Sequence, residues 1–201
     1  MFLYINLGSV MSTKILILTL LISILSIMIG CSGTKSYEQT TGEEEFETPF
    51  NSAEYQSDNE FFRAKQSGKS PDLATSKKIA LQNAKSEIAG KIQTTIKNVT
   101  DQYTNQRSIG NKQEYENKFE ELAREVVNQE LVDVKIMEEK TFKAQDGGYT
   151  YWIAIEISKD AILNGINSGI SERKKLKLDF DKQQFEKIFN EEMKKFENEK
   201  Q

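Results

Sequence analysis

The residue with the clearest chemical potential is Cys31, the single cysteine of a 201-residue chain that contains no histidine. A cysteine nucleophile needs a neighbouring base or cation to form its thiolate, and histidine is the usual base. The sequence therefore excludes Cys-His and Ser-His-Asp catalysis. A zinc site made of cysteine and histidine is excluded as well. One cysteine cannot form an intramolecular disulfide, so the fold has no disulfide framework.

Carboxylates are the remaining candidates for acid–base chemistry, and the chain has 31 of them against 27 lysines and arginines. The two signs are interleaved along the sequence, so no carboxylate pair stands out and no basic stripe suited to nucleic acid is present. Neither a phosphate-binding G-x-x-x-x-G-K-[ST] loop nor a dinucleotide-binding fingerprint occurs. Interspersed charge is what a soluble surface requires. We therefore expect no catalytic residue, no metal ion, no cofactor and no nucleic-acid partner.

The N-terminus has the pattern of a secretory signal. Residues 15–29, ILILTLLISILSIMI, form an uncharged apolar run that follows Lys14. A positive residue before a short apolar run is typical of a signal peptide, and the run is shorter than the roughly 20 residues of a spanning helix. Met11 is an alternative start, because MSTKILILTLL already contains a charged and an apolar region. Residues 1–30 are thus predicted to be a signal peptide.

The apolar run ends in Met28-Ile29-Gly30-Cys31, which resembles the bacterial lipobox, where an aliphatic and a small residue precede a cysteine. Met28 stands where leucine is usual. The resemblance implies that the Cys31 sulfur takes a diacylglyceryl group and that signal peptidase II cuts between Gly30 and Cys31. Two or three acyl chains hold a protein stably on a membrane, whereas one does not. The alternative is an uncleaved N-terminal anchor in which the cysteine is incidental.

Residues 31–59 are predicted to be the lipidated cysteine followed by a flexible tether. Residues 32–59 are rich in Ser, Thr, Glu, Asn and Gly and show neither a helical nor a strand period, which is typical of a disordered or weakly ordered segment. Such a tether lets a folded body stand off the bilayer. We expect a protein of the bacterial envelope, anchored by lipid to the outer membrane and facing the periplasm or the cell surface.

Beyond the tether, the pattern predicts a short strand over 60–68 and then a long helix that starts at Ser70-Pro71-Asp72. The helix has one apolar side: Leu73, Ala80, Leu81, Ala84, Ile88, Ile92, Ile96, Val99 and Tyr103. Small residues early in the helix predict a close neighbour there, and Gly90 is a candidate bend. A second helix is expected over 112–131, with an apolar side of Tyr115, Phe119, Leu122, Val126 and Val127.

A β-hairpin is the strongest local prediction. Val132, Val134 and Ile136 alternate with polar residues, and Gln145-Asp146-Gly147-Gly148 favours a tight turn. Alternate residues of the second strand then form one apolar face: Tyr149, Tyr151, Ile153, Ile155 and Ile157. Trp152 and Ala154 lie on the other face. Trp152 is therefore either covered by a helix or exposed, and if exposed it is the best candidate for a binding anchor.

The C-terminal part is predicted to be helical again. Ile162, Ile166 and Ile170 form a stripe, and a final helix capped by Asp181 carries Phe185, Ile188, Phe189, Met193 and Phe196. Residues 176–180 alternate, so they fit a short strand or more helix, with a break near 179–181. The fold class is α+β: a small antiparallel sheet packed against a long amphipathic helix, with an additional C-terminal helix.

Two segments, FFRAKQSGKSPDLATSKKIALQNAKSEIAGKI and DGGYTYWIAIEIS, together with the lipobox, resemble the Lpp-twenty-type bacterial envelope lipoproteins. They are also similar to the related N-terminal domain of the flagellar assembly factor FlgT. The resemblance covers residues 60–170 and implies a compact α+β domain of an outer-membrane lipoprotein. It is carried by residue types and spacings rather than by a catalytic signature. Residues 171–201, a charged helical extension, lie outside it.

Three functions remain open on this sequence. The first is a non-enzymatic envelope lipoprotein that acts through protein contacts in assembly, scaffolding or adhesion, with an envelope protein or a second copy as partner. Its candidate contact residues are Trp152, Phe185, Phe189 and Phe196. The second is a periplasmic lipoprotein that binds a small molecule or lipid in an apolar groove between the helix and the sheet. The third is a carboxylate-dependent hydrolase with a convergent acidic pair in a cleft.

Overall fold

The structure is a computed structural model that describes residues 46–145 and 147–198. The chain divides into two compact units, Met1–Phe46 and Glu47–Gln201. Every helix and strand of the described residues belongs to the second unit. The predicted signal peptide, Gly30 and Cys31 lie outside the described residues.

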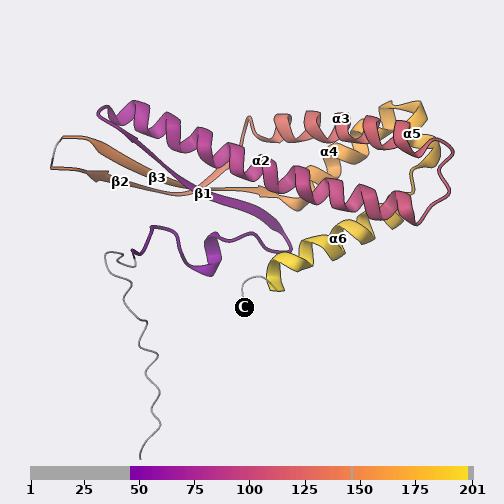
Figure 1. Cartoon of the computed structure of the whole chain (residues 1–201), viewed down its shortest axis with the longest axis horizontal. Helices are drawn as coiled ribbons and strands as arrows, with labels where there is room; N and C mark the ends of the chain where they lie inside the picture. The colour runs from indigo at the N-terminus through magenta and orange to yellow at the C-terminus, as the bar shows by residue number, and fades with distance from the viewer. Residues whose placement is uncertain (1–45, 146, 199–201) are drawn as a thin grey trace, which may run out of the picture. The chain divides into compact units, whose positions relative to one another are not determined.

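Three antiparallel strands form one sheet, in the order β1–β3–β2 (Figure 1). The strands are β1 (Phe61–Ser70), β2 (Lys135–Lys143) and β3 (Tyr149–Ser158). β3 is the central strand and pairs with β1 along its whole length. β1 and β2 are therefore the two edges of the sheet.

β2 and β3 form the predicted hairpin, and Gly147 in its turn has a φ of +89°, as a glycine turn allows. The predicted start of the first strand is wrong. Residues 131–133 form a turn, and Val132 is 71% exposed, because the chain turns there out of the preceding helix before it reaches β3. A bulge between Ile136 and Glu138 then shifts the register of β2 against β3.

One face of the sheet is covered by α2 (Leu73–Asn105), which packs on β1 and β3. The Asp72 side chain accepts a hydrogen bond of 2.7 Å from the Thr75 backbone N–H and so caps the helix. The helix runs through Gly90 without interruption. The predicted apolar side is confirmed from Ala80 to Tyr103, whereas Leu73 and Leu81 are half-buried. The buried residues of α2 are Ser76, Ala80, Ala84, Ile88, Ile92, Thr95, Ile96, Val99, Thr100, Tyr103 and Thr104.

β1 approaches the first half of α2 very closely at Gly68. A Cβ atom at this position would lie 2.3 Å from the Ser76 carbonyl oxygen and 2.6 Å from the Ala80 nitrogen. Only glycine fits there, since both neighbouring atoms belong to backbone. The prediction that small residues early in the helix meet a close neighbour is thus confirmed.

Four further helices complete the unit: α3 (Lys112–Glu130), α4 (Lys159–Glu172), α5 (Lys174–Asp179) and α6 (Lys182–Asn198). α3 packs between α2 and α4, and α6 packs on α2. The stretch 176–180 is mostly helical, in α5, and not a strand. The predicted break follows it, and the Asp181 side chain caps α6 by accepting a hydrogen bond of 3.1 Å from the Gln184 N–H.

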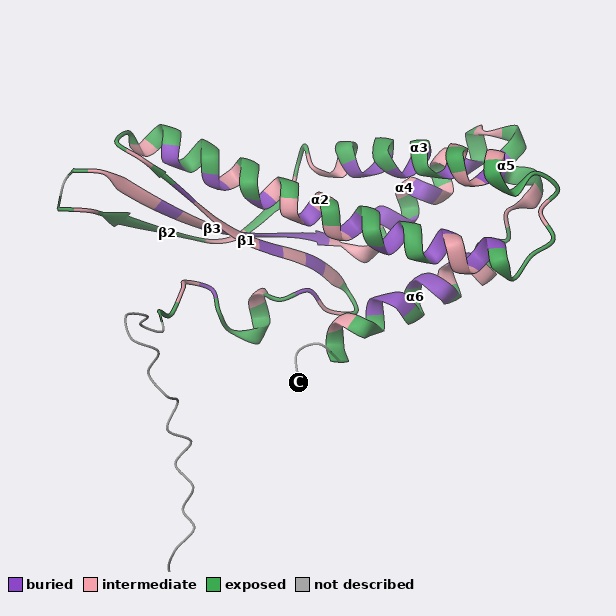
Figure 2. Ribbon diagram, viewed as in Figure 1, coloured by how far each residue is buried: buried purple, intermediate pink, exposed green. Residues whose placement is uncertain are grey.

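Tyr103 links the break between α5 and α6 to the end of α2 by two hydrogen bonds. Its hydroxyl donates to the Asp179 carbonyl oxygen at 2.8 Å and accepts from the Asp181 N–H at 2.7 Å. Buried residues of α2, α3, α4, α6 and the sheet make one hydrophobic core (Figure 2). The segment 171–201 is therefore part of the folded unit as far as α6 is described, and not an appendage to a domain that ends at residue 170.

The folded unit also begins earlier than residue 60. Residues 47–59, called the N-terminal segment below, contain a short helical turn, η2 (Ala53–Tyr55). Phe50 is 4% exposed, and the Lys65 ammonium donates to its carbonyl oxygen at 2.8 Å and to the Asn51 side-chain oxygen at 2.9 Å. The polar composition of this segment does not indicate that two aromatic residues, Phe50 and Tyr55, attach it to the sheet.

We predict that Gly68→Ala destabilises the protein by about 1–3 kcal/mol, because the new methyl group overpacks the contact between β1 and α2. Gly90→Ala is the matched control. A Cβ atom at Gly90 meets nothing within 4 Å, so alanine there should stabilise α2 by about 0.5–1 kcal/mol. Urea unfolding followed by circular dichroism measures both variants. Equal effects of the two substitutions would contradict the close contact at Gly68.

Candidate contact surfaces

Trp152 lies on the face of the sheet opposite α2, called the outer face below. The pairing of β3 places Ser67 of β1 on one side of Trp152 and Lys140 of β2 on the other. Trp152 is half-buried. The prediction that it points away from the apolar face is confirmed, and its ring is neither sealed by a helix nor fully exposed.

Phe185 and Phe189 are fully buried, so the prediction that they contact a partner is wrong for this structure. The ring centroid of Phe185 lies 5.1 Å from that of Phe119 and 5.8 Å from that of Tyr103. Phe189 packs edge-on against Phe62 at 6.4 Å. The apolar stripe of α6 is thus used within the unit, where it joins α2, α3 and β1.

Phe196, the last of the predicted contact residues, is half-buried and packs edge-on against Phe62 at 6.0 Å. It lines a groove of about 410 Å³ between α2 and α6, together with Gly90, Lys91, Thr94, Thr95, Asn98, Glu192 and Lys195. Part of its ring therefore faces solvent. This position leaves Phe196 and Trp152 as the two predicted anchors with accessible surface.

Glu192 is the buried acid of that groove and ties α6 to α2. Its carboxylate accepts hydrogen bonds from Asn98 at 2.9 Å and Gln102 at 3.1 Å, and it pairs with Lys195. Burial by itself would raise the pKa of Glu192, but the hydrogen bonds from Lys195, Asn98 and Gln102 outweigh it and hold the pKa below its usual value. Glu192 is therefore charged and fully engaged at neutral pH.

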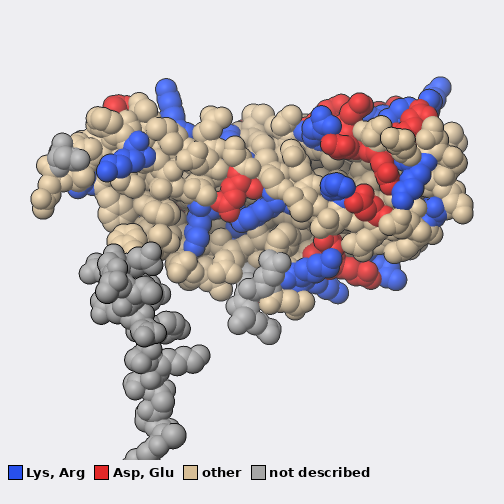
Figure 3. Space-filling model, in the orientation of Figure 1, with Lys and Arg blue, Asp and Glu red and all other residues tan. Residues whose placement is uncertain are grey.

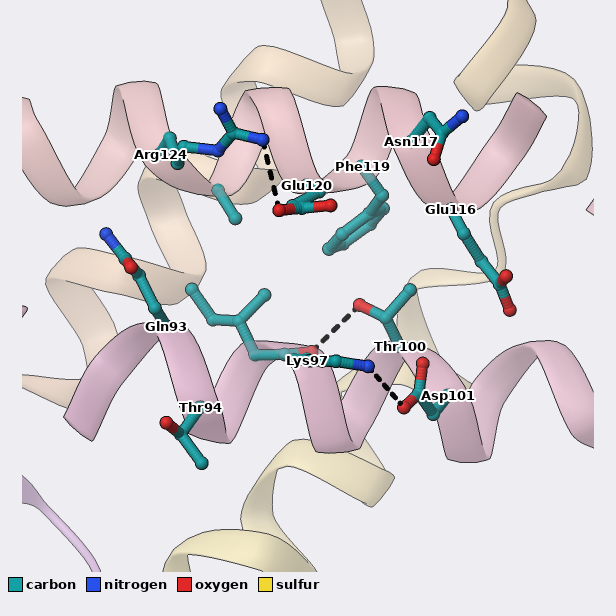
Figure 4. A pocket seen from close by; sticks show the side chains of 12 residues that line it. Gln93, Thr94, Lys97, Thr100, Asp101, Glu116, Asn117, Phe119, Glu120 and Arg124 are labelled. Carbon is teal, nitrogen blue, oxygen red and sulfur yellow. Dashed lines mark hydrogen bonds and ion pairs between the residues drawn. The ribbon is translucent and has the colours of Figure 1, made fainter. Parts of the chain in front are cut away.

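A second groove, of about 460 Å³, runs between α2 and α3 (Figure 4). Its floor is made of the buried residues Ile96, Thr100, Phe119 and Ala123, and its rim of exposed and half-buried polar side chains. The rim carries paired charges: Lys97 contacts Asp101 at 3.0 Å, and Arg124 contacts Glu120 at 3.0 Å. Because the rim is exposed along both helices, the groove opens to solvent and does not enclose a small molecule.

The N-terminal segment covers the part of the outer face nearest to the start of β1. Phe50 and Tyr55 lie with ring centroids 4.9 Å apart, and the Lys140 ammonium lies 5.0 Å above the Phe50 ring. The Tyr55 hydroxyl donates a hydrogen bond to Glu138. This hydrogen bond raises the pKa of Tyr55 to about 12 and lowers the pKa of the Glu138 carboxyl.

A cluster of ion pairs lies in the same part of the outer face. Arg63 pairs with Asp58 of the N-terminal segment and, at 3.0 Å, with one oxygen of Glu156. Lys135 pairs with the other Glu156 oxygen at 2.7 Å. Burial opposes ionisation of Asp58, but the hydrogen bond from Arg63 holds its pKa below the usual value. Since both Glu156 oxygens are held by cations, this buried acid is arranged for structure and not for acid–base chemistry.

Sequence reasoning missed the groove between α2 and α3 and the Arg63–Glu156 cluster. Their residues belong to the interleaved charges, which carry no period that separates paired groups from solvated ones. The pairing of Arg63 with Glu156 follows from the register of β1 and β3, which a single sequence does not give.

Within residues 46–145 and 147–198, no cluster of three or more Cys, His, Asp or Glu side chains is arranged to hold a metal ion. Over the same residues, no helix is long and apolar enough to cross a bilayer. No family model, curated protein or solved structure matches the chain.

We predict that Glu192→Gln destabilises the protein by about 1–3 kcal/mol at neutral pH, since it weakens a buried charged hydrogen-bond network. The folded-state pKa of Glu192 lies below its unfolded value of 4.5. Its contribution is therefore present above about pH 4.5 and lost as the pH falls through the folded-state pKa. Urea unfolding at pH 7 and pH 3 should show the gap between wild type and variant shrink at pH 3. The exposed neighbour Glu191 provides the control, Glu191→Gln; a gap that does not depend on pH would contradict the role of Glu192.

Proposed function

We propose that this protein is a bacterial envelope lipoprotein of the Lpp-twenty type, anchored through acylated Cys31, that acts through protein contacts and not by catalysis. The observation that carries the proposal is the sequence Met28-Ile29-Gly30-Cys31 at the end of an uncharged run. The folded unit starts at Glu47, 16 positions after Cys31. A lipid on Cys31 would therefore hold a complete folded body close to the bilayer.

The groove between α2 and α3 is the surface best suited to a protein partner. Its apolar floor is flanked by oppositely charged side chains from both helices. Protein interfaces combine an apolar centre with a polar, charged rim in this way. A partner could lie across this floor, over the buried Phe119, while its neighbouring residues meet the charged pairs.

The alternative function, binding of a small molecule or lipid between the helix and the sheet, receives no support from the packing. That interface is filled by side chains from both layers. Ile88 and Ile92 of α2 and Phe62, Ile153 and Ile155 of the strands are all at most 2% exposed. A ligand there would have to displace the core of the unit.

The first prediction of the proposed function concerns the lipid anchor. Cys31→Ser should abolish incorporation of a labelled fatty acid and leave the precursor uncut, because signal peptidase II acts only after the sulfur has been modified. Ser32→Ala is the control and should be processed and labelled as the wild type is. Metabolic labelling followed by gel analysis of the membrane fraction measures both. Normal labelling of Cys31→Ser would contradict the proposal.

The second prediction of the proposed function concerns the groove between α2 and α3. If Cys31 is acylated, a new cysteine is the only free thiol of the mature chain. A photo-crosslinker on Asn117→Cys, at the rim of the groove (Figure 4), should give one dominant crosslinked protein in intact envelopes. Adding Arg124→Glu should reduce that product several-fold, with a structural cost of no more than about 0.5 kcal/mol because its ion pair is exposed.

The matched control carries the crosslinker on Gln183→Cys, an exposed position of α6, and should not give that product. Lys187→Glu, also exposed on α6, controls for the change of charge. Recovery of monomer alone from Asn117→Cys would contradict a role of this groove in protein contact.

A further inference from the structure

The N-terminal segment reaches the second half of the outer face at Lys140, whose ammonium lies 5.0 Å above the Phe50 ring. Two rows of the sheet run across this half: Lys69, Thr150 and Phe142 in one, and Ser67, Trp152 and Lys140 in the other. These six residues are called the distal outer face below. Phe142 is 49% exposed and Trp152 is half-buried. The surface thus combines two accessible aromatic rings with two lysines and two small hydroxyl residues.

The distal outer face contains no carboxylate in either row. Lys69 is exposed and forms no ion pair with a described carboxylate, and Lys140 is paired only loosely, with Glu138 of the adjoining row at 3.5 Å. Elsewhere on the unit, acidic and basic side chains lie next to one another, most clearly over α3 and α5 (Figure 3). Of the two lysines of the distal outer face, Lys69 is thus the one that no described carboxylate balances.

The chain that leads to Cys31 leaves the folded unit at the border of this surface. Phe50 lies beneath the Lys140 ammonium, and Glu47 precedes it by three positions. The 16 positions between Cys31 and Glu47 span at most about 55 Å even when fully extended. A lipid on Cys31 would therefore keep the bilayer within about 55 Å of Glu47.

We propose that the distal outer face is a membrane-facing surface that rests on the headgroups of an anionic phospholipid bilayer. This inference rests on the proposed lipid anchor at Cys31. Tryptophan and other aromatic rings favour the interfacial region of a bilayer, and lysine side chains place their ammonium groups among the phosphates while their stems cover apolar surface. Lys69 and Lys140 would contact the phosphates on either side of Trp152 and Phe142.

A membrane fits this surface better than a protein partner for two reasons. The distal outer face lies where the chain to the anchor leaves the unit, so a membrane reaches it without a further binding event. It also lies on the side of the sheet opposite α2. Resting on the bilayer here would leave the groove between α2 and α3 free for a protein partner.

Trp152 makes the proposal directly testable, because it is the only tryptophan of the chain. The lipidated protein is inserted into vesicles of phosphatidylcholine, with or without phosphatidylglycerol, that contain a trace of lipid with a nitroxide on its headgroup. We expect the nitroxide to quench Trp152 fluorescence about twofold more strongly in the anionic vesicles. Added salt at about 1 M should remove the difference, since it shortens the screening length to about 3 Å.

Two variants test the surface itself. Lys69→Glu and Phe142→Ser should each reduce the quenching in anionic vesicles to the level of neutral ones. Lys174→Glu and Leu178→Ser are the matched controls, because both positions are exposed on α5, and they should leave the quenching unchanged. Far-ultraviolet circular dichroism of each variant confirms that the fold is kept.

The outcomes separate this inference from the proposed function. Partition of the protein into the detergent phase of Triton X-114 shows first whether the lipid is present. A lipidated protein whose Trp152 is quenched equally in both kinds of vesicle, or equally in Lys69→Glu and wild type, overturns the membrane-facing surface alone. That result is also what a surface reserved for a protein partner gives. A protein without lipid that stays in the aqueous phase overturns the proposed function and, with it, this inference.

Discussion

The contact between Gly68 of β1 and the first half of α2 is the constraint on which the rest of the arrangement depends. The strand lies so close to the helix backbone that no side chain fits between them at that point. α2 is thereby fixed on one face of a sheet that has only three strands, and its 33 residues continue past β1. The part of α2 that extends beyond the strand supplies the surface on which α3 and α6 pack. The other face of the sheet receives no helix from α2 and must be covered in another way.

That other face is only partly covered, and this determines which of its residues remain accessible. The N-terminal segment covers one half through Phe50, Tyr55 and the ion pair between Asp58 and Arg63. The other half keeps Trp152 and Phe142 accessible between lysines. Because the same segment leads back to Cys31, one short stretch of chain both completes the fold and fixes where an anchor would attach. The groove between α2 and α3 is lined by residues of those two helices and not by the N-terminal segment.

The periodic parts of this fold could be predicted from the sequence, and the parts that depend on pairing could not. The apolar side of α2 and the β2–β3 hairpin follow from repeats of 3.6 and 2 residues, and Asp181 was recognisable as a cap. The N-terminal segment escaped prediction because two aromatic residues in a polar stretch have no period. Phe185 and Phe189 show most clearly what the sequence does not predict. An amphipathic helix indicates that one of its sides is covered, but not whether its own domain or a partner covers it. The acidic and basic residues of the grooves could not be sorted before the helices that carry them were placed side by side.

The proposed acylation of Cys31 as the first residue of the mature protein is tested most directly by mass spectrometry of the N-terminal peptide from purified envelopes. We expect a chain that begins at Cys31, with a diacylglyceryl group on its sulfur and, where the α-amine is also modified, a third acyl chain. An unmodified Cys31 in a chain that still carries residues preceding Gly30 would contradict the account.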